Sequence, residues 1–149
     1  MRTIFDDDAR HDLTGRLDRL TADSRASWGK MSPAQMVKHC RLWEEMIHQN
    51  KIFKRPLIGK LIGPIILKKV LKTPEFRKNS PTIPEMLVTE TGIDFDEERR
   101  KLVALVNGYP TYNWPDNSFI HPFFGKMTRE QIGKMAYLHL DHHLKQFGC

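Results

Sequence analysis

Apolar residues recur at helical spacing in four segments of the chain. The clearest stripe runs through Met36, Cys40, Trp43 and Ile47, which follow the three- to four-residue period of one helix face. Polar residues fill the positions between them, so one side of this helix is expected to be buried. The same kind of pattern predicts α-helices over residues 6–22, 33–50, 94–108 and 128–148.

Two of these predicted helices have well-marked N-termini. Ser32 fits the N-cap, Pro33 fits the first helical position, and Gln35 is placed to complete a capping box. Thr128 and Gln131 repeat the same spacing at the start of the last segment. Both helices are therefore expected to begin at these positions.

A long connection separates the second predicted helix from the third. It covers residues 51–93, which is long for a structureless loop, and the Gly63-Pro64 pair predicts a short helix over residues 64–72 within it. No segment alternates apolar and polar residues over a useful strand length. We therefore predict one all-α domain over residues 1–149, a four-helix bundle with a long crossover between its second and third helices.

Composition and charge limit the classes of protein that fit. The chain has 149 residues and is 40% hydrophobic, and its two cysteines, Cys40 and Cys149, predict free thiols rather than a disulfide framework. No apolar run is long enough to span a bilayer, and the N-terminus lacks a signal-peptide core, so we expect a cytoplasmic protein with no membrane partner. The net charge is +6, with much of the excess between residues 51 and 78. Because no nucleic-acid motif accompanies this charge, it is interpreted as a solvated surface.

Three histidines are predicted to face the interior. His139 and His143 are four residues apart, so on a helix their side chains share one face, with Cβ atoms about 5–6 Å apart. His39 lies on the apolar side of the second helix, beside Met36 and Trp43. Buried imidazoles need partners, and these three could be hydrogen-bonded core histidines or ligands of one divalent metal ion. Three imidazoles with an open position are typical of catalytic zinc, and nickel also accepts imidazole.

Other polar residues near these histidines each have two interpretations. Gln146 either supports a ligand or lies at the surface, and His121 either acts as a proton donor near the metal or caps its loop; they are the two candidate catalytic residues. Cys40 is either a fourth ligand or, as we favour, a buried core thiol. His142 points away from His139 and is the weaker ligand candidate. Three further ionisable residues are expected at the surface: His11, His48 and Asp141.

Two motifs resemble a known superfamily. The first reads W-G-K-M-S-P-A-Q-M-V-K-H at residues 28–39, and the second reads H-x-x-x-H-x-x-Q at residues 139–146. Together they resemble the DinB/YfiT-like superfamily and, more closely, an uncharacterised bacterial family within it. The resemblance implies an up-up-down-down four-helix bundle whose metal triad matches His39, His139 and His143. It also implies frequent homodimers, and activities that include S-transfer with low-molecular-weight thiols, isomerisation and hydrolysis.

These observations leave two principal functional hypotheses. The first is a metal-dependent transferase or hydrolase that acts on a small molecule, with the substrate entering beside Trp114, Phe119 and Phe124. The second is a non-catalytic module that binds a metal or another ligand, which a closed four-coordinate site would favour. Nucleic-acid binding ranks last, because the basic stretch lacks interleaved aromatic residues that could stack on bases.

Overall fold

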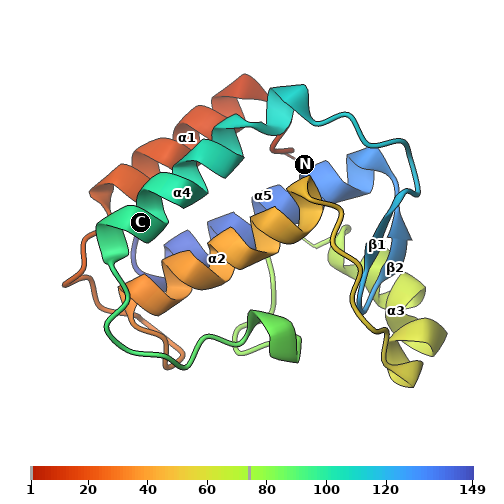
Figure 1. The fold of residues 1–149 in the computed structure, drawn as a ribbon, viewed down its shortest axis with the longest axis horizontal. Helices are drawn as coiled ribbons and strands as arrows, with labels where there is room; N and C mark the ends of the chain where they lie inside the picture. Colours follow the sequence, from red (N-terminus) through yellow and green to blue (C-terminus); the bar gives the residue numbers. More distant parts are fainter. Residues whose placement is uncertain (1, 74) are drawn as a thin grey trace.

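The computed structural model describes residues 2–73 and 75–149. Over these residues the chain is mostly helical, with five α-helices and one small sheet (Figure 1). The helices are α1 (Asp7–Arg19), α2 (Pro33–His48), α3 (Leu57–Val70), α4 (Phe95–Asn107) and α5 (Arg129–Gln146). The short elements are the 3-10 helices η1 (Pro84–Met86) and η2 (Tyr109–Thr111) and the strands β1 (Phe119–His121) and β2 (Gly125–Met127).

The four helices predicted from the apolar pattern correspond to α1, α2, α4 and α5. Both predicted capping boxes are confirmed: the Ser32 hydroxyl accepts from the Gln35 amide at 3.2 Å, and Thr128 accepts from Gln131 at the same distance. At the start of α4, Asp94 accepts from the Glu97 amide at 2.9 Å. These contacts satisfy N–H groups that have no partner within the helix.

The same four helices bury the main apolar core between them. The pair α1 and α4 lies side by side, and α2 and α5 lie across the core from them (Figure 1). The leucines of α1, Leu13 and Leu17, are fully buried, as are Leu102 and Val106 of α4. The apolar stripe of α2 is also buried, as its spacing predicts.

One buried ion pair corrects an expectation about α5. Asp141 was expected at the surface, but it is buried and its Oδ1 accepts from Arg16 Nη1 of α1 at 2.7 Å. The two residues are 125 positions apart in the chain, so helix spacing gives no indication of the pair. Arg16 makes a further bond to the Cys149 carbonyl at 3.1 Å.

Helix α3 differs from the helix predicted within the crossover. That helix was expected over residues 64–72 because proline favours the first turn, but α3 begins at Leu57 and continues through Pro64. It packs against the hairpin (Figure 1), and Leu67 near its C-terminal end joins the main core. No helix in the described ranges is long and apolar enough to cross a membrane.

The hairpin is the second difference from the predicted architecture. Strands β1 and β2 pair in antiparallel register, with Phe119 opposite Met127 and His121 opposite Gly125. Each strand has only three residues, which is too short for an alternating pattern to be recognised in the sequence. The hairpin precedes α5 and places His121 beside the helical core.

Candidate metal centre

The three predicted core histidines meet between α2 and α5. His39 comes from the middle of α2, and His139 and His143 come from successive turns of α5. All three are buried, and one ring nitrogen from each lies within 4.8 Å of the others. This cluster could hold a metal ion.

The rings converge without being parallel. The ring centroids of His39 lie 5.1 Å from His139 and 4.9 Å from His143, and those of His139 and His143 are 4.8 Å apart. The Nε2 atoms of His39 and His139 are 3.1 Å apart. Two imidazole nitrogens bound to one tetrahedral zinc ion would be about 3.3 Å apart, given bonds of about 2.0–2.1 Å.

Hydrogen bonds to the opposite ring nitrogens fix the tautomers of two of the histidines. His39 Nδ1 lies 2.8 Å from the Met86 carbonyl of η1, which can only accept, so Nδ1 carries the proton and Nε2 keeps its lone pair. His143 Nδ1 lies 2.9 Å from Gln146 Oε1. The Gln146 amide nitrogen donates to the Trp28 carbonyl at 2.7 Å, which leaves Oε1 free to accept from His143. Such contacts orient metal-binding imidazoles.

A glycine explains how the Trp28 carbonyl reaches Gln146. Gly29 has a φ of +81°, a backbone conformation that side chains disfavour. A Cβ atom at this position would lie 2.5 Å from Gln146 Nε2. The Trp-Gly pair at the start of the first motif is therefore part of the support for His143.

Burial keeps the three imidazoles neutral. Desolvation lowers the pKa of His39, and it lowers the pKa of His143 to about 3. The pKa of His139 is also well below its ordinary value, first because of burial and then because of the neighbouring histidines. At neutral pH the three rings are therefore uncharged and do not repel a cation. The Nδ1 atom of His139 is buried and has no hydrogen-bond partner among the described residues.

The remaining ligand candidates lie outside the cluster. The Cys40 Sγ atom lies 3.7 Å from the Met36 sulfur, and burial raises the pKa of this thiol well above its ordinary value. Cys40 is therefore the buried core cysteine that we favoured. His142 is half-buried beside Trp28, with ring centroids 5.6 Å apart.

His121 makes the contacts of a loop cap. Its Nδ1 accepts from the backbone N–H groups of Phe123 and Phe124, at 3.1 and 3.2 Å. Its ring stacks on Phe124 and lies 6.5 Å from Trp43, which in turn stacks on His139 at 4.7 Å. Burial, followed by the charge of Arg55, lowers the pKa of His121 to about 3. The residue is thus neutral at pH 7 and has one nitrogen committed to the hairpin.

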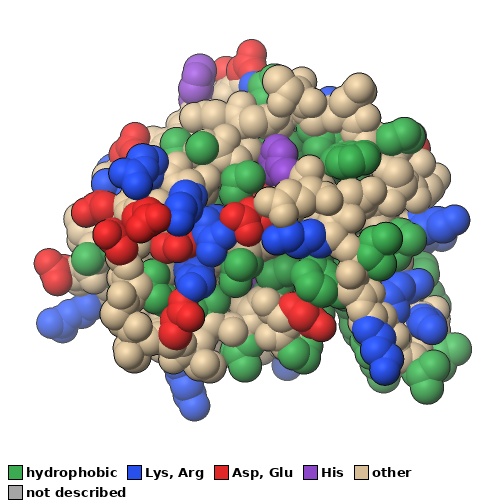
Figure 2. Space-filling view, in the orientation of Figure 1, with side chains coloured by type: hydrophobic (Ala, Val, Ile, Leu, Met, Phe, Trp, Pro, Cys, Tyr) green, Lys and Arg blue, Asp and Glu red, His purple; other side chains and the backbone are tan. Residues whose placement is uncertain are grey.

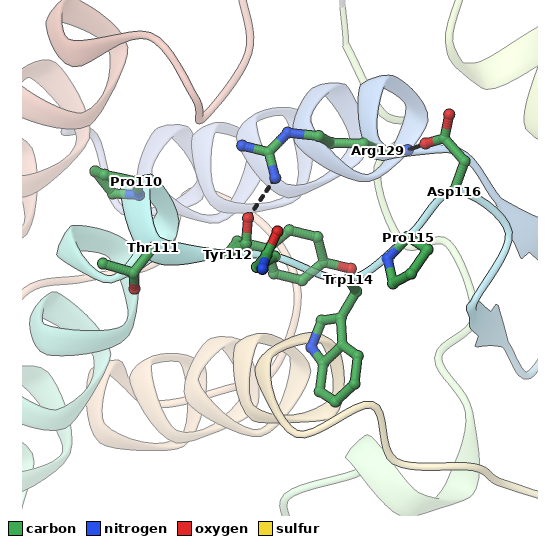
Figure 3. Close-up of a pocket in the computed structure, with 8 residues that line it drawn as sticks. Pro110, Thr111, Tyr112, Trp114, Pro115, Asp116 and Arg129 are labelled. Atoms are coloured by element: carbon green, nitrogen blue, oxygen red, sulfur yellow. Dashed lines mark hydrogen bonds between the residues drawn. The ribbon is translucent and has the colours of Figure 1, made fainter.

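The aromatic rings that flank His139 are not among those expected at the substrate entrance. Trp43 and Phe76 flank His139, whereas Phe119 is fully buried. Trp114 lines a separate pocket of about 670 Å³ together with Arg129 (Figure 3). None of the three clustered histidines lines that pocket.

A second buried polar group was not predicted. Glu44 of α2 is fully buried and accepts a hydrogen bond from the Tyr109 hydroxyl, and burial raises the pKa of its carboxyl to about 8. His48, expected at the surface, is half-buried, with its ring 4.6 Å from Tyr109. The only sequence signal was that Glu44 follows Cys40 by four residues on the apolar stripe. His11 is exposed, as expected.

The fold and the cluster define a helical protein with a buried three-histidine site. The chain belongs to the family described as "Protein of unknown function (DUF1569)", whose model matches residues 5–148. The searches of curated proteins and of solved structures gave no match. The family description states no activity.

Proposed function

We propose that the protein is a metal-dependent enzyme that binds one divalent ion, zinc or nickel, through His39, His139 and His143. The observation that carries this proposal is the convergence of three buried neutral imidazoles, with the Nδ1 atoms of His39 and His143 already held by acceptors. The 3.1 Å between the Nε2 atoms of His39 and His139 is close to the spacing of two ligands on one ion. Such an ion would also give the clustered lone pairs a shared partner.

Three protein ligands leave a coordination position for a reactant. Among the described residues, only these three histidines form a group of potential ligands of this kind, which argues against a site closed by Cys40 or His121. A divalent ion in this environment supplies a Lewis acid that activates a nucleophile at neutral pH. The chain itself orients the imidazoles through Met86 and Gln146, and the burial of the site excludes bulk solvent.

The resemblance to the DinB/YfiT-like superfamily suggests the reaction class. We propose a four-helix bundle of that type, a homodimeric assembly, and S-transfer with a low-molecular-weight thiol or a hydrolysis as the reaction. The aromatic side chains of Trp43 and Phe76 beside His139 would suit a substrate with an apolar part. Gln146 is assigned a positioning role through His143.

A non-catalytic metal site is the second candidate, and burial is the observation that favours it. The exposed fractions of His39, His139 and His143 are only 5%, 8% and 8%. A structural metal needs no access for a substrate, whereas an enzyme needs a path to the open position.

Cobalt substitution separates these two functions. The visible spectrum of Co²⁺ bound to the metal-free protein is expected to change when cysteine or azide is added, because an open position admits a new ligand. The His39→Ala variant serves as a control for specific loading. A cobalt spectrum that stays constant at saturating thiol and azide would favour the structural role.

Gln146 provides a test of the support for His143. The Gln146→Ala change is expected to lower metal affinity by about 10- to 100-fold, since it removes the acceptor that orients His143. Affinity would be measured by competition with a chromophoric chelator. Lys145→Ala, which alters the neighbouring exposed position, is the matched control. Equal affinities for the two variants would contradict the positioning role.

A further inference from the structure

The outer face of α3 is apolar and is not covered by any other described part of the chain. Leu57 and Leu61 are each 77% exposed and Ile65 is 68% exposed, and these three residues repeat at four-residue spacing along one side of the helix. Ile58, 59% exposed, borders the same stripe. Single exposed apolar residues are common, but a contiguous stripe of this kind is typical of a contact surface.

The charge around this stripe has a single sign. Residues 51–72 include no acidic residue. Figure 2 shows hydrophobic and basic side chains, with no acidic ones, on the lobe formed by α3. The basic residues of this segment number seven: Lys51, Lys54, Arg55, Lys60, Lys68, Lys69 and Lys72.

The orientation of α3 is fixed by its opposite face. Gly59 and Gly63 are buried against the hairpin, and a Cβ atom at Gly63 would lie 2.0 Å from the Phe123 carbonyl oxygen. The close approach needs glycine at both positions. The helix therefore cannot turn its apolar stripe toward the hairpin without losing this contact, and the stripe stays directed outward.

We propose that α3 docks the protein on a membrane surface that contains anionic lipids. The helix would lie in the plane of the interface, with Leu57, Leu61 and Ile65 inserted at the boundary of the acyl chains. Lys60 and Lys68 would reach lipid phosphates while their methylene groups cover apolar surface. Such docking requires no membrane-spanning helix. This docking is independent of metal binding. It differs from the expectation of no membrane partner, because that expectation considered only segments that could span a bilayer.

The charge pattern favours this partner over a second copy of the chain. A two-fold interface brings the same patch of two subunits together, so α3 packed on α3 would place two uniformly basic segments in contact. Like charges at that distance oppose association, whereas an anionic surface neutralises them. A partner that contacted only the basic residues would leave the apolar stripe exposed, whereas a membrane can cover both.

Vesicle co-sedimentation of the full chain tests the proposal. The protein is expected to bind vesicles of equimolar phosphatidylcholine and phosphatidylserine at least tenfold more tightly than vesicles of pure phosphatidylcholine. The variant Lys60→Gln/Lys68→Gln/Lys69→Gln is expected to weaken binding by about fivefold for each lysine, and added salt should weaken it further. The variant Leu57→Ser/Leu61→Ser/Ile65→Ser should lose binding to both kinds of vesicle.

Two controls make the result decisive. The variant Lys30→Gln/Arg100→Gln/Lys101→Gln removes the same charge from exposed positions outside α3 and should bind like the wild type. Thermal unfolding establishes that each variant is folded. Equal binding to neutral and anionic vesicles, or no binding to either, would overturn the proposal. A wild-type dimer in sedimentation velocity that the serine variant converts to a monomer would assign the stripe to a second copy instead.

Discussion

Replacing His143 with alanine is expected to lower the affinity of the protein for a divalent metal ion by about 100- to 1,000-fold. A four-ligand structural zinc site is stabilised by about 10–16 kcal/mol, so one ligand accounts for about 3–4 kcal/mol. Each 1.4 kcal/mol corresponds to about tenfold in affinity. His39→Ala and His139→Ala should have effects of the same size, because all three residues share the cluster.

The measurement is metal content after dialysis, followed by a chelator competition for each variant. His142→Ala is the matched control, since His142 neighbours His143 in sequence but does not belong to the cluster. Circular dichroism in the presence of chelator verifies that the variants remain helical. Full metal retention in all three ligand variants would exclude the proposed site.

The metal-free protein is expected to lose about 3 kcal/mol of unfolding free energy between pH 7 and pH 5. Burial sets the pKa of His121 and His143 to about 3 and that of His139 well below its ordinary value, while the unfolded chain keeps values near 6.5. The unfolded state therefore binds more protons below pH 6.5, so stability falls as the pH falls. His121 and His143 each contribute about 2 kcal/mol over this interval, and His139 acts in the same direction.

Protonation of Glu44 changes the unfolding free energy in the opposite direction. Its pKa is raised to about 8 in the folded state, so the folded protein binds the extra proton between about pH 8 and pH 4.5 and gains stability as the pH falls. This offsets about 2–3 kcal/mol of the histidine effect between pH 7 and pH 5.

Urea unfolding at the two pH values, with chelator present, measures the net change in unfolding free energy caused by the histidines and Glu44. Glu44→Gln should enlarge the loss to about 5–6 kcal/mol, whereas His121→Asn should reduce it by about 2 kcal/mol. His11→Gln alters an exposed histidine and should change nothing. Stability that is constant between pH 7 and pH 5 in both the wild type and Glu44→Gln would contradict the burial of these groups.

Local patterns in the sequence predicted the features that depend on local geometry. The capping boxes at Ser32 and Thr128 follow from side-chain and backbone positions within one turn, and both form. The pairing of His139 with His143 follows from the four-residue rule for helices. His39 was placed with them because its helix face is apolar, and the three residues meet as predicted.

Features that depend on distant or backbone partners could not be predicted. The Met86 carbonyl that orients His39 comes from the crossover, where no periodic pattern places it. Asp141 is buried because Arg16 reaches it from another helix. The early start of α3 reflects tight packing of Gly59 and Gly63 on the hairpin, which outweighs the preference of Pro64 for a first turn.

The distribution of the three histidines along the chain has a consequence for the order of folding. His139 and His143 are brought together by a single turn of helix, whereas His39 is 100 positions away from His139. A nascent α5 alone can offer two imidazoles to an ion, and such binding to the unfolded chain reduces the net stabilisation that the metal confers. The third imidazole joins the site only when α2 packs against α5. This contact has a high entropic cost because it closes a long loop. An ion bound by all three would therefore chiefly slow the separation of α2 from α5, and so prolong the lifetime of the native state.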